Sequence, residues 1–153
     1  MRLRPPSVRF FFVCLITSLV AGCSEPSAGT PDPNRKLRIA VIPKGTTHEF
    51  WKSVHHGALR AAKELNVEII WKGAVNESSR EAQINIVQDF VNAGVDGICL
   101  APISKDSLIP PVQQAKQAGI PTVIFDSGLD DTESIVSYVA TDNEKGGRLG
   151  RSA

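Results

Sequence analysis

The chain has 153 residues, of which 42% are hydrophobic and 22% charged, and its formal net charge is +1. This balance offers no cluster of positive charge for nucleic acid, so we expect no nucleic-acid partner. Two of its three cysteines, Cys14 and Cys23, lie near the N-terminus. The third, Cys99, stands in an apolar segment and is interpreted as a small buried hydrophobe.

The first 22 residues have the parts of an export signal. Three arginines flank the start of the chain, and an apolar run follows at residues 10–20, which is shorter than the roughly 20 residues of a membrane-spanning helix. The run ends in Val-Ala-Gly-Cys at residues 20–23, which resembles the bacterial lipobox. The resemblance implies that residues 1–22 are removed and that Cys23 is lipidated. An ordinary secretory signal with a chance cysteine is the alternative.

The lipidated cysteine is followed by a stretch that cannot form a core. Residues 24–35 consist mainly of proline, glycine and small polar residues, a composition typical of a flexible tether. We therefore expect residues 23–35 to link a folded domain to a membrane through the lipid on Cys23. The expected location is the periplasm or cell envelope, with the domain lipid-anchored.

From residue 36 onward, short apolar runs alternate with segments of helical periodicity. Strands are expected at residues 37–42, 67–71, 95–100, 121–125 and 135–140. The first helix is expected to carry its apolar face from Phe50 to Leu65. Ser78 and Glu81 have capping-box spacing, which predicts the start of the second helix.

Later helices have equally clear signals. Gly94 is expected to end the second helix, and Pro110 and Pro111 fit a third helix only within its first turn. A fourth helix is expected to begin at Asn143, with Asp142 and Asn143 at its N-terminal cap. Residues 144–153 contain only Leu149 as a large apolar residue, so we expect the chain to be a fragment of a longer protein.

This alternation predicts an α/β fold with a parallel, doubly wound sheet over residues 36–153. Ligands of such sheets bind beyond the carboxyl ends of the strands, near the point where the strand order reverses. The corresponding loops are residues 43–48, 72–78, 101–107 and 126–131.

Several segments together resemble one known family. They are Ile39–Ala62 and residues 94–98, 118–121, 125–127 and 140–143 with Gly146 and Gly147. In order and spacing they are similar to the periplasmic sugar-binding proteins of ABC importers, of the ribose and galactose class. That family has two lobes that clamp a ligand between them. The resemblance implies that residues 36–153 form the N-terminal lobe alone, and incompletely.

The resemblance also implies candidate ligand-binding residues. Phe50 and Trp51 stand where the family packs an aromatic pair against a sugar ring, although both also fit the helix's apolar face. Asp126 directly follows the fourth strand, where a carboxylate accepts sugar hydroxyls; an aspartate that caps a turn is the alternative. Ser127 stands where relatives carry arginine, and this departure weakens any claim for ribose itself. His48 occupies the place of a polar contact residue, or is an exposed loop histidine.

Lys44 and Asp142 are secondary candidates for ligand contact. No metal site and no cofactor are expected, because the sequence lacks metal-ligand spacing and a glycine-rich phosphate loop. It also lacks a nucleophile-elbow motif, so we expect no enzymatic activity.

The resulting functional hypothesis is a solute-binding lipoprotein. It would capture a sugar or related small polar solute outside the cytoplasmic membrane and deliver it to an ABC permease. The alternative is a binding protein that presents its ligand to a sensor kinase or chemoreceptor. A regulator of the lactose-repressor class would need an N-terminal helix-turn-helix, where this sequence has an export signal.

Overall fold

The computed structural model describes residues 34–150, with side chains to residue 148. The predicted signal peptide, the lipidation of Cys23 and the tether up to residue 33 lie outside the described residues. Within them, every helix is too short or too polar to cross a bilayer.

Five parallel strands and four helices alternate along the described chain. The strands are β1 (Arg38–Ile42), β2 (Glu68–Trp71), β3 (Gly97–Leu100), β4 (Thr122–Phe125) and β5 (Ser137–Val139). The helices are α1 (Glu49–Leu65), α2 (Arg80–Asn92), α3 (Ile109–Gln117) and α4 (Asn143–Gly150). The strand order in the sheet is β2-β1-β3-β4-β5, and every pairing is parallel.

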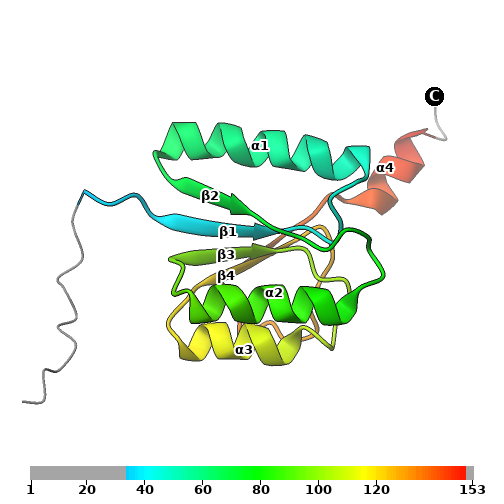
Figure 1. Cartoon of the computed structure of the whole chain (residues 1–153). Helices are drawn as coiled ribbons and strands as arrows, with labels where there is room; N and C mark the ends of the chain where they lie inside the picture. The colour runs from blue at the N-terminus through cyan, green and yellow to red at the C-terminus, as the bar shows by residue number, and fades with distance from the viewer. Residues whose placement is uncertain (1–33, 151–153) are drawn as a thin grey trace, which may run out of the picture. The chain divides into compact units, whose positions relative to one another are not determined.

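The helices lie on both faces of the sheet, which confirms the doubly wound α/β class. Figure 1 shows α1 on one face, α2 and α3 together on the other, and α4 beyond the end at which the strands finish. The central strands β1, β3 and β4 are short, mostly apolar and largely buried, which suits a sheet covered on both faces, whereas the edge strand β5 is exposed.

Most of the core lies between the sheet and the pair α2–α3. Val87 and Val112 of these helices pack there with Ile98, Leu100 and Ile124 of β3 and β4. The α1 face is less closed, because an apolar hollow remains beside that helix. Its lining includes Ile39, Val41, Val54, Cys99 and Phe125. Burial raises the pKa of the Cys99 thiol, which agrees with a packing role for this residue.

The start of α2 differs from the prediction. The helix begins at Arg80 with Ser79 as its N-cap, and the cap makes no side-chain hydrogen bond, so the capping box of Ser78 and Glu81 is not formed. Asn76 explains the difference. Its Oδ1 accepts hydrogen bonds from the Ser78 hydroxyl at 2.6 Å and the Ser78 amide at 3.2 Å. This side-chain turn competes successfully with the helix for Ser78.

Other helix ends follow the sequence signals. Gly94 follows the end of α2 with a φ of +60°, a left-handed conformation that glycine adopts without strain. Pro110 and Pro111 lie in the first turn of α3, where a missing N–H is harmless. Strand β5 is shorter than predicted and covers Ser137–Val139.

A bidentate ion pair anchors the beginning of the folded unit. Arg35, at the expected end of the tether, donates from its two terminal nitrogens to Asp96 at 2.7 and 2.5 Å. The Arg38 amide donates to the same carboxylate at 2.8 Å. These bonds, with the arginine hydrogen bond contributing most, hold the pKa of Asp96 well below its usual range. They lie at the amino ends of the strands, opposite the loops expected to bind ligand.

Candidate ligand-binding site

The strand order places the reversal point between β1 and β3. Strand β2 pairs with one edge of β1. Strands β3, β4 and β5 follow in order from the opposite edge of β1. Loops that follow β1 and β3 therefore diverge, which opens a crevice at the carboxyl edge of the sheet. The predicted site loops lie at this edge.

Three predicted site residues meet there. Lys44, after β1, places its Nζ 2.7 Å from Oδ2 of Asp126, after β4. The Lys44 ammonium also donates to the Ser127 hydroxyl, and that hydroxyl donates to Asp126 Oδ2 at 3.2 Å. We call these three residues the polar cluster. Its side chains are partly buried, so the ion pair is shielded from water without being closed off.

The backbone aims Asp126 into this cluster. Its φ is +65°, in the left-handed region, which aspartate tolerates better than most residues. Its amide donates to the Val139 carbonyl at 2.9 Å, which ties the turn to β5. Tyr138 donates from its hydroxyl to the Asp126 carbonyl at 3.4 Å. The carboxylate is therefore presented by a turn that is held from the neighbouring strand.

The two predicted aromatic residues have different environments. Phe50 is 48% exposed, whereas Trp51 is 2% exposed. Their rings meet edge to face with centroids 4.9 Å apart, and the Trp51 ring also meets Phe125 edge to face at 6.3 Å. Phe50 thus offers a free ring, and Trp51 supports it from within. A role of Trp51 in filling the interior, left open by the sequence, agrees with this burial.

His48 and Asp142 both act as helix caps. The Nδ1 atom of His48 accepts a hydrogen bond from the Phe50 amide at 3.2 Å, and His48 is the N-cap of α1. Asp142 Oδ1 accepts from the Lys145 amide at 2.9 Å, which agrees with the capping interpretation of Asp142. Contact of either residue with a ligand stays a prediction.

Sequence reasoning missed Gln83 of α2, which is fully buried. Its Nε2 donates to the carbonyls of Pro43 at 3.2 Å and Ala101 at 2.9 Å, and its Oε1 accepts from the Ile103 amide at 2.9 Å. Gln83 therefore joins the loops after β1 and β3 across the reversal point. A signal was present in the sequence, because Gln83 occupies a position on the apolar face of α2 with Val87 and Phe90.

Sequence reasoning also missed Glu77, in the loop between β2 and α2. Its Oε1 accepts a hydrogen bond from the indole nitrogen of Trp51 at 2.7 Å. The sequence contains no local sign of this contact, because the two residues are 26 positions apart.

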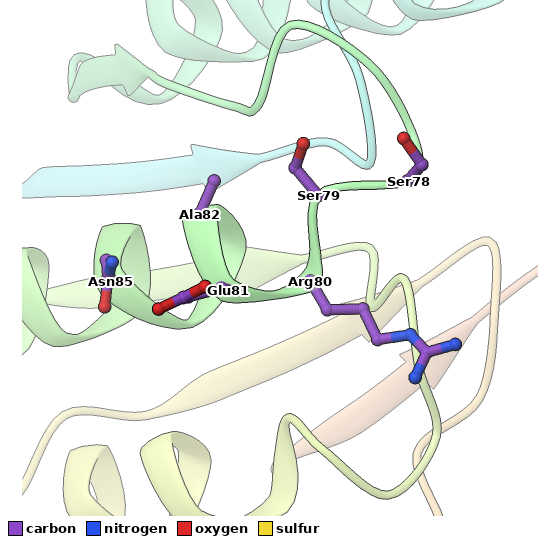
Figure 2. A pocket seen from close by; sticks show the side chains of 6 residues that line it. All are labelled: Ser78, Ser79, Arg80, Glu81, Ala82 and Asn85. Atoms are coloured by element: carbon purple, nitrogen blue, oxygen red, sulfur yellow. The ribbon is translucent and has the colours of Figure 1, made fainter.

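A second hollow lies on the surface at the start of α2, and it lacks convergent groups. Its lining consists of Ser78, Ser79, Arg80, Glu81, Ala82 and Asn85. Figure 2 shows the Arg80 side chain extending away from Glu81 and Asn85. Among residues 34–148, no three histidine, cysteine, aspartate or glutamate side chains gather in a way that could hold a metal ion.

A parallel α/β lobe with polar and aromatic side chains at its carboxyl edge is an architecture that binds small ligands. A family model described as a periplasmic binding protein domain matches residues 39–152. The chain therefore belongs to the periplasmic binding protein family, as the resemblance in the sequence implied.

Individual relatives agree with this assignment. The D-ribose/D-allose-binding protein of Pseudomonas aeruginosa is 35% identical over 129 residues, which are 80% of this chain and 40% of that protein. A solute-binding protein of Agrobacterium vitis with bound D-fucose is 38% identical, with a TM-score of 0.70, over 75% of this chain and 41% of that one. A carbohydrate transporter protein of Agrobacterium radiobacter in complex with D-arabinose has a TM-score of 0.71 at 32% identity, over 78% of this chain and 40% of that one.

The chain thus spans about two fifths of the length of these relatives. They are named as binding or transport proteins rather than as enzymes, which agrees with the lack of catalytic motifs in the sequence.

Proposed function

We propose that this chain contributes the N-terminal lobe of a lipoprotein that captures a sugar or related small polar solute between two lobes for an ABC permease. One observation carries the proposal: the polar cluster of Lys44, Asp126 and Ser127 lies at the carboxyl edge of the sheet. The exposed Phe50 ring is linked to it through Trp51 and Phe125. One relative is named for the sugars D-ribose and D-allose, and two related structures hold a bound sugar.

The chemistry of this edge suits a neutral polyhydroxylated ligand. Sugar hydroxyls both donate and accept hydrogen bonds, so a carboxylate, an ammonium and a hydroxyl side by side can pair with adjacent hydroxyls. The C–H face of a sugar ring needs apolar cover, which Phe50 supplies. Because Lys44 and Asp126 balance each other's charge, the cluster has no excess charge to attract an ion.

The binding proposal is tested by calorimetric titration of the full-length protein with a panel of pentoses, hexoses and polyols. We expect at least one member to bind with a dissociation constant in the micromolar range or below, which corresponds to a free energy of about −8 kcal/mol or better. If no member of the panel binds, the sugar assignment fails and a different solute class becomes the better hypothesis.

We also propose that Cys23 carries the lipid that holds the protein at a membrane in the periplasm or cell envelope. Each buried methylene contributes about 0.8 kcal/mol, so two or more acyl chains give stable anchoring. Intact-mass spectrometry of protein from a bacterial host is expected to show an N-terminal diacylglyceryl cysteine, and cell fractionation is expected to recover the protein with the membranes. A Cys23→Ser variant is expected to lose both properties, and an unmodified N-terminus at Ser24 or later contradicts the prediction.

A further inference from the structure

The indole of Trp51 is held by a carboxylate from another loop. Trp51 is 2% exposed, and a buried indole N–H needs an acceptor. Glu77 supplies this acceptor at 2.7 Å from Nε1. A hydrogen bond to an ionised acceptor is roughly twice as strong as a neutral one, so this contact holds the orientation of the ring more firmly than an amide or hydroxyl would.

The same carboxylate joins the loop that follows β2 to helix α1. The hydrogen bonds between that loop and the loop after β1 are longer: the hydroxyls of Thr46 and Thr47 donate to the carbonyls of Ala74 at 3.4 Å and Val75 at 3.3 Å. Glu77 also packs over Gly45, where an added Cβ would lie 3.1 Å from its Cγ. Its side chain therefore lies directly against the residue that follows Lys44.

Trp51 in turn supports both halves of the candidate site. Its ring meets the rings of both Phe50 and Phe125 edge to face, and Phe125 immediately precedes Asp126. A rotation of the indole would therefore displace the exposed aromatic ring and loosen the packing beneath the turn that carries the carboxylate.

We propose that Glu77 is a positioning residue of the ligand site: by holding the Trp51 indole, it sets the place of the Phe50 ring and of the Asp126 turn. This inference rests on the proposed sugar-binding function. If the inference holds, the loop after β2 affects ligand affinity through Glu77. Glu77 does so indirectly, by holding Trp51, and does not contact the ligand itself.

The test uses the full-length protein and three variants: Glu77→Ala, which removes the acceptor, Glu77→Gln, which keeps a neutral one, and Glu81→Ala. Glu81 is an exposed carboxylate in the first turn of α2, so its removal matches the change in charge. The indole N–H signal of Trp51, assigned by its loss in Trp51→Phe, is followed by 1H–15N NMR. Sugar affinity is measured by calorimetry, and folding by the thermal midpoint.

We expect Glu77→Ala to shift the Trp51 indole signal, to speed its hydrogen exchange and to weaken sugar binding about tenfold, which corresponds to about 1.4 kcal/mol. Glu77→Gln is expected to recover most of the affinity, and Glu81→Ala to match the wild type. If Glu77→Ala does not fold, Glu77→Gln provides the test. A smaller shift of the Trp51 indole signal and a loss of sugar affinity of about two- to threefold are then expected.

Three results would overturn the inference. The first is unchanged affinity in Glu77→Ala. The second is weakened affinity with an unchanged indole signal, which would point to direct ligand contact by Glu77. The third is an equal loss in Glu81→Ala, which would point to a general charge effect. If the wild-type protein binds no sugar, the proposed function fails separately, and an unaltered indole signal in Glu77→Ala still rejects the positioning role.

Discussion

Replacement of Asp126 by alanine is expected to weaken sugar binding by the full-length protein from about thirtyfold to several thousandfold. Removal of one partner from a buried, charged set of hydrogen bonds costs about 2–5 kcal/mol. At about 1.4 kcal/mol per tenfold change in affinity, this cost corresponds to the expected loss. The substitution also leaves the Lys44 ammonium without its partner at 2.7 Å. Calorimetric titration with a sugar that binds the wild type measures the effect.

The backbone at Asp126 determines which variants are informative. Because φ is +65° there, alanine is strained, and part of its effect falls on folding. The variant Asp126→Asn tolerates this conformation and keeps the side-chain shape but not the charge, so an intermediate loss of affinity is expected. Asp130→Ala removes a carboxylate from an exposed position in the same loop and is expected to bind like the wild type. Equal binding by wild type and Asp126→Ala would show that the site is elsewhere.

Replacement of Gln83 by leucine is expected to lower the free energy of unfolding by about 3 kcal/mol. The side chain has a similar size, but two buried backbone groups and one partly buried group lose their partner, and each unsatisfied buried group costs about 1–3 kcal/mol before relaxation. These groups are the carbonyls of Pro43 and Ala101 and the amide of Ile103. Urea denaturation of the full-length protein measures the change.

Two further variants separate hydrogen bonding from packing at this position. Gln83→Glu keeps the acceptor for Ile103 but loses both donors and introduces a buried charge, so it is expected to be at least as unstable as Gln83→Leu. Gln114→Leu on the exposed face of α3 is the matched control, with an expected change below about 0.5 kcal/mol. A loss below about 1 kcal/mol in Gln83→Leu would refute the role of Gln83 as the brace between the loops.

Local patterns in the sequence determined the class of fold and the edge of the sheet that carries the candidate site. Apolar runs gave the five strands, helical spacing gave α1, and Gly94 and the proline pair marked helix ends that the structure confirms. The prediction failed at the start of α2, because a side-chain turn centred on Asn76 competes with a capping box of equal plausibility. Such competition between local hydrogen bonds cannot be resolved from spacing.

Only the tertiary structure decided which residues meet. Lys44 and Asp126 are far apart in the chain, and they become partners because the strand order places the ends of β1 and β4 on either side of β3. The same folding buries Trp51, leaves Phe50 exposed and brings Glu77 to the indole. Helical periodicity placed Phe50 and Trp51 on the same apolar face. Periodicity identifies which face a residue lies on, but it does not show what other parts of the protein cover that face. The strand order and the contacts between loops are set by packing between residues far apart in the chain. A single sequence carries no local pattern that reports such packing.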